Sequence, residues 1–133
     1  MLPSSTVKTG GETVQQKATH IIVLVTTSSR EEAEKIAKTL LEERLVACAN
    51  IIGPVHSLFW WQGKIDTAQE HLILMKTRKD LFSKLSERVK ALHSYQIPEI
   101  IAVPIVKGFK PYMEWLEDSL KMSDNAEMSK YLK

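Results

Sequence analysis

The sequence predicts an α+β domain built on an antiparallel sheet, and three observations lead to this fold class. Stretches with strand character alternate with two amphipathic helical stretches in the order β-α-β-β-α-β, and a further helix follows them. The chain has 133 residues, which fits a single domain. Right-handed crossovers then place the first two helices on the same face of the sheet. This is the ferredoxin-like arrangement of two split βαβ units.

The first unit begins with His20–Thr27, a β-branched run that predicts a strand. Residues 28–45 predict a helix, because their apolar side chains recur at positions i, i+3, i+4, i+7 and i+8. Ser29 followed three residues later by Glu32 has the spacing of a capping box at the start of that helix. Val46–Ile52 predicts the second strand.

A β-hairpin joins the two units. The chain stays extended after Gly53-Pro54, and residues 62–64 predict the turn, where Gly63 supplies a positive φ. The return strand is expected to end in His71–Thr77, another run of apolar and β-branched residues.

The second unit continues with a helix, a strand and a final helix. Residues 78–93 carry a buried stripe at helical spacing, and residues 99–106 predict the fourth strand. Pro104 inside that strand indicates an edge position or a bulge, because proline cannot donate to the sheet. Residues 110–121 predict the last helix, with Pro111 in its first turn.

Composition describes an ordinary globular protein of the cytoplasm. Hydrophobic residues make up 44% and charged residues 26% of the chain, and the net charge is +2, which indicates no nucleic-acid partner.

The single cysteine excludes an internal disulfide and agrees with a reducing compartment. No apolar run is long enough to cross a membrane. We expect a flexible tail over residues 1–18, a domain over 19–121 and a C-terminal tail over 122–133.

The strands are apolar on both faces, although two helices can cover only one face. His20–Val25 and Leu72–Met75 do not alternate between apolar and polar residues, as half-exposed antiparallel strands do. At the hairpin, Leu58 and Trp60 point to one side, and Phe59 and Trp61 to the other. We therefore predict a homo-oligomer in which the helix-free faces meet and the hairpin reaches a neighbour. The alternative is a hairpin that folds back onto its own sheet.

Four motifs resemble those of the CutA family, the divalent cation tolerance proteins. They occur in order between residues 20 and 120, and they are Ala47-Cys48-x-Asn50-Ile51, Ser57-x-Phe59-Trp60-Trp61-x-Gly63-Lys64-Ile65, Lys76-Thr77, and His93-x-Tyr95-x-x-Pro98-Glu99-Ile100-Ile101. The resemblance implies a ferredoxin-like homotrimer, close in architecture to the PII signalling proteins. It also implies a link to copper and other divalent metals, but no known reaction. Ser94 departs from the proline that the family usually has.

Three residues are candidate metal ligands. Cys48 is either an apolar filler of its strand or a soft ligand for Cu(I). His93 either complements the C-terminal end of its helix or contributes an imidazole to a cleft, together with the Glu99 carboxylate. In the hairpin, Phe59, Trp60 and Trp61 are expected in the trimer interface.

Further candidates line the predicted cleft. The Tyr95 hydroxyl lies in the same short segment as His93, Asn50 belongs to the cysteine motif, and Lys76 either attracts an anion or is a snorkelling surface lysine. The remaining histidines and the acidic groups of the hairpin return, His20, His56, His71, Asp66 and Glu70, are expected mainly to be solvated, although a metal pair of Glu70 with His71 stays open.

The sequence predicts no enzyme and no organic cofactor, because it contains no nucleophile elbow, phosphate loop or paired catalytic carboxylates. The leading hypothesis is a trimer of the CutA type that binds copper or another divalent cation weakly at clefts between subunits. The alternative is a PII-like signalling trimer that senses a small anion or nucleotide and passes the signal to a protein partner.

Overall fold

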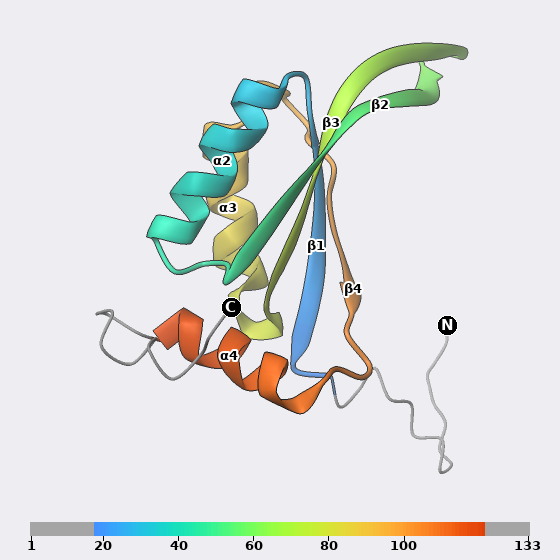
Figure 1. Cartoon of the computed structure of the whole chain (residues 1–133). Helices are drawn as coiled ribbons and strands as arrows, with labels where there is room; N and C mark the ends of the chain where they lie inside the picture. The colour runs from blue at the N-terminus through green and yellow to red at the C-terminus, as the bar shows by residue number, and fades with distance from the viewer. Residues whose placement is uncertain (1–17, 122–133) are drawn as a thin grey trace.

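The computed structural model describes residues 18–121 (Figure 1). The expected tails, residues 1–18 and 122–133, lie outside this range except for Ala18. The elements are β1 (His20–Thr27), α2 (Arg30–Glu42), β2 (Cys48–Trp61), β3 (Lys64–Arg78), the 3-10 turn η1 (Lys79–Leu81), α3 (Phe82–Leu92), β4 (Ile100–Pro104) and α4 (Lys110–Lys121). Their order confirms the predicted βαββαβ pattern with an added helix.

The four strands form one antiparallel sheet in the order β2-β3-β1-β4. This is the strand order of the ferredoxin-like arrangement, with the first and third strands in the centre. Pro104 is the last residue of β4, which is an edge strand, so the expectation drawn from this proline is confirmed.

Helix α2 begins where the sequence places its cap. The Ser29 side chain accepts a hydrogen bond from the Glu32 amide at 3.1 Å, which satisfies one of the free N–H groups of the first turn. In a complete capping box, the Glu32 carboxylate would also accept a hydrogen bond from the Ser29 amide, and it does not do so here. It accepts instead from the Ser28 amide at 3.2 Å and from the amide of Ser94, far along the chain, at 2.7 Å.

The hydrophobic core lies between the sheet and the layer of α2 and α3, which cover the same face (Figure 1). Alternate residues of β1 point into it, and the register aligns Val23 with Met75 and Val25 with Ile73 of β3. These four side chains are fully buried. The second predicted helix starts as η1 and becomes α-helical only at Phe82, and its buried stripe contains Leu85.

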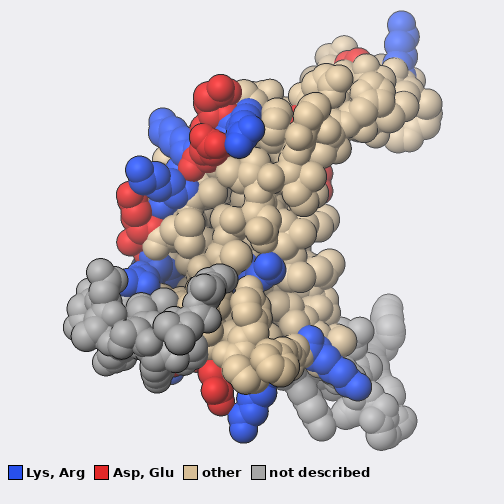
Figure 2. Space-filling model, viewed as in Figure 1, with Lys and Arg blue, Asp and Glu red and all other residues tan. Residues whose placement is uncertain are grey.

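The opposite face of the sheet has no helical layer within the described residues. Neighbouring strands place Asn50, Leu74, Leu24 and Ile101 in one row across it. Ile101 remains 48% exposed. Figure 2 shows charged side chains gathered over the helices, at the lower end of the molecule and at the tip of the arm, while the visible surface between them is mostly uncharged. The prediction of strands that are apolar on both faces is confirmed.

Beyond a bulge between Ile52 and Val55, β2 and β3 leave the sheet and project as a two-stranded arm (Figure 1). The two-residue turn at its tip has positive φ at both Gln62 (51°) and Gly63 (79°), the backbone of a type I′ hairpin. The alternative of a hairpin folded back on its own sheet is wrong, because Trp60 is 74% exposed.

Candidate functional site

The predicted site residues separate into two polar groups at different heights of the sheet. The first, here called the His93 cluster, consists of Glu32, Glu70, His93 and Tyr95. It joins the start of α2, strand β3 and the loop after α3. The second, the Lys76 cluster, consists of Cys48, Asn50 and Lys76 on the helix-free face, with Tyr112 of α4 beside it.

His93 is a buried structural histidine in this chain. Its side chain has no exposed surface. Nε2 lies 2.7 Å from the Thr26 carbonyl oxygen, which can only accept, so Nε2 carries a proton and donates it. Nδ1 accepts from the Tyr95 amide at 3.0 Å. Both ring nitrogens are therefore used by the backbone, and neither has a lone pair directed at solvent.

Tyr95 and Glu70 form the second contact of the His93 cluster. The Tyr95 hydroxyl donates to Glu70 Oε2 at 2.7 Å, and Glu70 is only 8% exposed. Burial, followed by the hydrogen bond and the negative charge of Glu70, raises the pKa of Tyr95 to about 12. The expectation that Glu70 only solvates the hairpin return is wrong, because its acceptor role fixes a tyrosine 25 positions further along the chain.

Glu32 completes this cluster, and the sequence alone did not identify it as a site residue. Its Oε2 lies 3.5 Å from Nδ1 of His93. Burial raises the pKa of Glu32, but hydrogen bonds from Ser94 and Ser28 outweigh burial and hold the pKa below its ordinary value. The ionised Glu32 carboxylate thus links the start of α2 to the loop after α3 through these hydrogen bonds.

Glu99 stands apart from these contacts. It is exposed just before β4, and its side chain makes no hydrogen bond or ion pair with the described part of the chain. Among residues 18–121, no three His, Cys, Asp or Glu side chains come close enough together to hold a metal ion. Within one chain, the predicted ligands His93, Cys48 and Glu99 therefore do not form a site.

The Lys76 cluster occupies the helix-free face near the start of β2. The Lys76 ammonium donates to Asn50 Oδ1 at 3.1 Å and lies 4.0 Å from Cys48 Sγ. It also lies 5.9 Å from the centroid of the Tyr112 ring. The structure thus brings together three of the predicted residues from β2 and β3, and it adds an α4 residue that the sequence did not indicate.

Cys48 and His93 are well separated in one subunit. The sheet register places Cys48 beside Lys76, which pairs with Ile22, whereas His93 contacts Thr26. Ile22 and Thr26 are four positions apart on β1, which corresponds to about 13 Å along the strand. Their joint ligation of one ion within a subunit is excluded by this geometry.

Two of the other three histidines differ from the expected solvated state. His20 Nε2 pairs with Glu117 Oε1 of α4 at 2.8 Å. His71 is half-buried against Gly53, and its Nδ1 has no hydrogen-bond partner among the described residues. Only His56 is exposed as expected.

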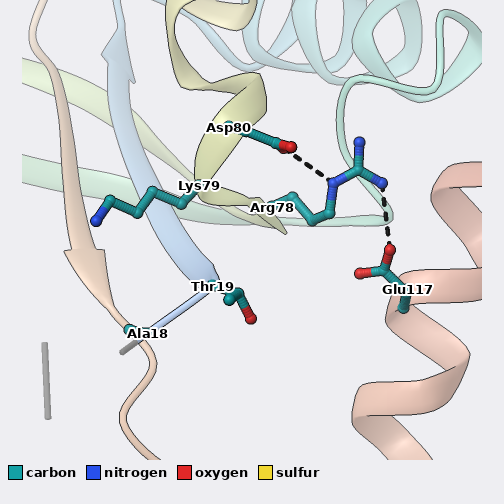
Figure 3. Close-up of a pocket in the computed structure, with 6 residues that line it drawn as sticks. All are labelled: Ala18, Thr19, Arg78, Lys79, Asp80 and Glu117. Atoms are coloured by element: carbon teal, nitrogen blue, oxygen red, sulfur yellow. Dashed lines mark hydrogen bonds and ion pairs between the residues drawn. The ribbon is translucent and has the colours of Figure 1, made fainter. Parts of the chain in front are cut away.

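A pocket of about 600 Å³ lies at the lower end of the sheet, where β1 starts and β3 ends. Figure 3 shows Arg78 between two carboxylates, with Lys79 pointing away from them. Arg78 Nε lies 2.9 Å from Asp80, and its Nη1 lies 3.3 Å from Glu117. Because the ion pairs neutralise the charges inside this pocket, the pocket has no strong charge preference for a ligand.

The predicted interface residues lie on the arm and face outward. Phe59, Trp60 and Trp61 are all exposed, and Trp61 retains 59% of its surface. Single exposed apolar residues are common, but three consecutive exposed aromatic residues on a projecting arm are typical of a protein that contacts another chain.

The fold and these surfaces define the class of protein: a ferredoxin-like domain with a long β-arm and a sheet face left uncovered by its own helices. Comparison with known proteins identifies the family. Residues 21–119 match the family model described as "CutA1 divalent ion tolerance protein". The chain belongs to this family.

Relatives of similar length support the assignment. The chain is 45% identical over 102 residues to the divalent-cation tolerance protein CutA of Archaeoglobus fulgidus, an alignment that covers 77% of this chain and 99% of that protein. It is 50% identical over 98 residues to the protein of the same name from Thermus thermophilus, covering 74% and 95% of the two chains.

Solved structures of relatives share this fold. The periplasmic divalent cation tolerance protein CutA from Archaeoglobus fulgidus superposes with a TM-score of 0.75, at 45% identity and with 77% and 99% of the chains covered. CutA1 from Oryza sativa gives a TM-score of 0.76, at 42% identity and with 80% and 97% covered.

Proposed function

We propose that this CutA protein acts as a homotrimer that binds copper or another divalent cation weakly at clefts between its subunits. The observation that carries the proposal is the uncovered sheet face together with the projecting aromatic arm. Family membership supports the role in divalent cation tolerance, and the resemblance of the motifs supplies the number of subunits.

The energetics favour association. Burying about 800 Å² of apolar surface at about 25 cal/mol per Å² favours association by about 20 kcal/mol before the entropy of association is subtracted. The arm supplies Trp60 and Trp61, residue types that are enriched at protein interfaces. A second chain over the helix-free face would also protect the exposed side chain of Ile101.

The donor positions favour binding between subunits. Because the described donors of one chain form no metal cluster, an ion of useful affinity needs groups from two chains. Glu99 is exposed and Cys48 is partly accessible, so these two are the available ligands. His93 would have to lose its bond from the Tyr95 amide before it could bind metal, so we assign it a supporting role in the loop.

Sedimentation tests the assembly. Wild type at micromolar concentration should sediment as a trimer, and a monomer at that concentration would refute the proposal. Trp60→Ser should shift the equilibrium toward monomer. Leu41→Ser, which changes an exposed apolar residue on α2, is the matched control and should leave the trimer intact.

Calorimetry with Cu(I), Cu(II) and Zn(II) tests metal binding. Cys48→Ser should weaken the heat with Cu(I), because thiolate is the soft ligand, and Glu99→Gln should weaken the heat with Zn(II). Glu87→Gln on α3 is the exposed control. No saturable heat in wild type, or equal heats in all variants, would count against these clefts.

The remaining expectations stay predictions. They are the absence of enzymatic activity and of an organic cofactor, the signalling alternative with its protein partner, and a cytoplasmic location. Relatives of the chain include a protein described as periplasmic and two described as chloroplastic. None of the helices in residues 18–121 is long and apolar enough to cross a membrane.

A further inference from the structure

The Lys76 ammonium is a half-buried charge without a counter-ion in residues 18–121. Its nearest groups are the Asn50 carbonyl oxygen at 3.1 Å, the Cys48 sulfur at 4.0 Å and the face of the Tyr112 ring. No ion pair joins it to a carboxylate of this range, although four other cations of the range, Arg30, Arg78, Arg88 and Lys121, have carboxylate partners. Its partners are neutral groups.

Two other half-buried cations of the chain have carboxylate partners. Arg78 contacts two carboxylates, and Arg88 lies 2.9 Å from Glu43. A charge that is partly removed from water is costly unless an opposite charge accompanies it. Lys76 therefore lacks the compensation that these arginines receive.

The groups around the ammonium are suited to an anion. Asn50 uses its carbonyl oxygen toward Lys76, so its amide nitrogen remains as a second donor at the same place. A cation and a neutral donor side by side are complementary to an oxyanion, which has several lone pairs.

The position limits the size of the occupant. Cys48 and Asn50 of β2 lie on one side of Lys76, Ile22 of β1 pairs with it on the other, and Tyr112 of α4 lies over the ammonium. Groups from three elements of the same chain thus approach the ammonium, and a small ion needs less room among them than a side chain delivered by another molecule.

We propose that the Lys76 ammonium and the Asn50 amide bind a small oxyanion in the corner between β2, β3 and α4. This site extends the expectation that Lys76 attracts an anion, and it does not depend on the proposed metal role. Closure of the sheet face by other subunits would increase the need for the anion, because it would remove water from the ammonium.

Thermal unfolding with inorganic phosphate tests the site, with chloride at equal ionic strength as the reference. At roughly five times the Kd of phosphate, the unfolding midpoint of wild type should rise by about 4 °C or more. Lys76→Gln should abolish the rise, Asn50→Ala should reduce it, and Lys76→Arg should retain part of it. Lys38→Gln, an exposed lysine on α2, should respond like wild type.

Three results would overturn the proposal. They are no saturable rise in wild type, an equal rise in Lys76→Gln, and loss of the rise in Lys38→Gln as well. Sedimentation of each variant without phosphate is measured in parallel. If Lys76→Gln alone lost its association there, the counter-charge would come from a neighbouring subunit, and the free-anion site would be wrong. If wild type were monomeric but still responded to phosphate through Lys76, the proposed trimer would be wrong and the proposed anion site would be supported.

Discussion

Removing the Tyr95 hydroxyl should destabilise the fold through Glu70. The 2.7 Å hydrogen bond joins a phenol to a carboxylate that is only 8% exposed, and a hydrogen bond to a charged group contributes about 1.5–3 kcal/mol. Tyr95→Phe leaves the buried carboxylate without this donor, so we expect it to lower the free energy of unfolding by that amount. Glu70→Gln keeps an acceptor in place and should cost less, about 0.5–1.5 kcal/mol.

The assay is urea unfolding of wild type, both single variants and the double variant at one protein concentration, since association makes stability depend on concentration. The double-mutant cycle should give a coupling energy of about 1 kcal/mol or more. A Tyr95→Phe variant within about 0.5 kcal/mol of wild type, or fully additive effects, would refute the reasoning.

The same pair predicts a dependence on alkaline pH. Because the folded pKa of Tyr95 is raised from 10.0 to about 12, the folded chain holds the phenol proton more tightly than the unfolded chain does. This contribution is fully present below pH 10.0 and is lost as the pH rises toward about 12. Tyr95→Phe should lack this part of the pH dependence, and the ultraviolet absorbance of tyrosinate should show one late-ionising tyrosine fewer.

Three further predictions concern α4, the bulge and the arm. Burial raises the pKa of Glu117, but the hydrogen bond from His20 and nearby positive charges hold it below the ordinary value of 4.5, so its contribution should be present above pH 4.5 and be lost at lower pH. Glu117→Gln should therefore be less stable than wild type in urea at neutral pH, with a difference that shrinks on acidification. Gly53→Ala should cost about 1–3 kcal/mol, measured by thermal unfolding, because a Cβ there would overlap the His71 ring. Trp60→Ser should leave the far-ultraviolet circular dichroism unchanged while sedimentation reports less association; a loss of folded signal would contradict this.

Local patterns were sufficient to predict most of the fold. The last helix lies at the predicted Lys110–Lys121, and Ser29 caps α2 as its spacing indicates. The apolar residues on both sides of β1 correctly indicated a face without its own helices. These predictions succeeded because each depends on residues that are neighbours in the sequence.

The site was less predictable because its contacts join distant parts of the chain. His93 was a reasonable ligand until the structure placed the Thr26 carbonyl and the Tyr95 amide against its two nitrogens. The sequence indicates only a solvated acid at Glu70, because its partner, Tyr95, lies 25 positions away. The spacing of residues in the sequence does not predict the contact between Tyr95 and Glu70, since this contact depends on how the loop after α3 returns to the sheet.

The arm should have a lower local stability than the rest of the sheet until neighbouring chains contact it. A two-stranded ribbon without a core is marginally stable in water, so the backbone amides between Val55 and Glu70 should exchange with deuterium much faster than those of β1 when the chain is dilute. As concentration rises and neighbours engage the tips, exchange there should slow, while the amides of β1 change little. The segment that recruits other copies would thus be the last to become rigid.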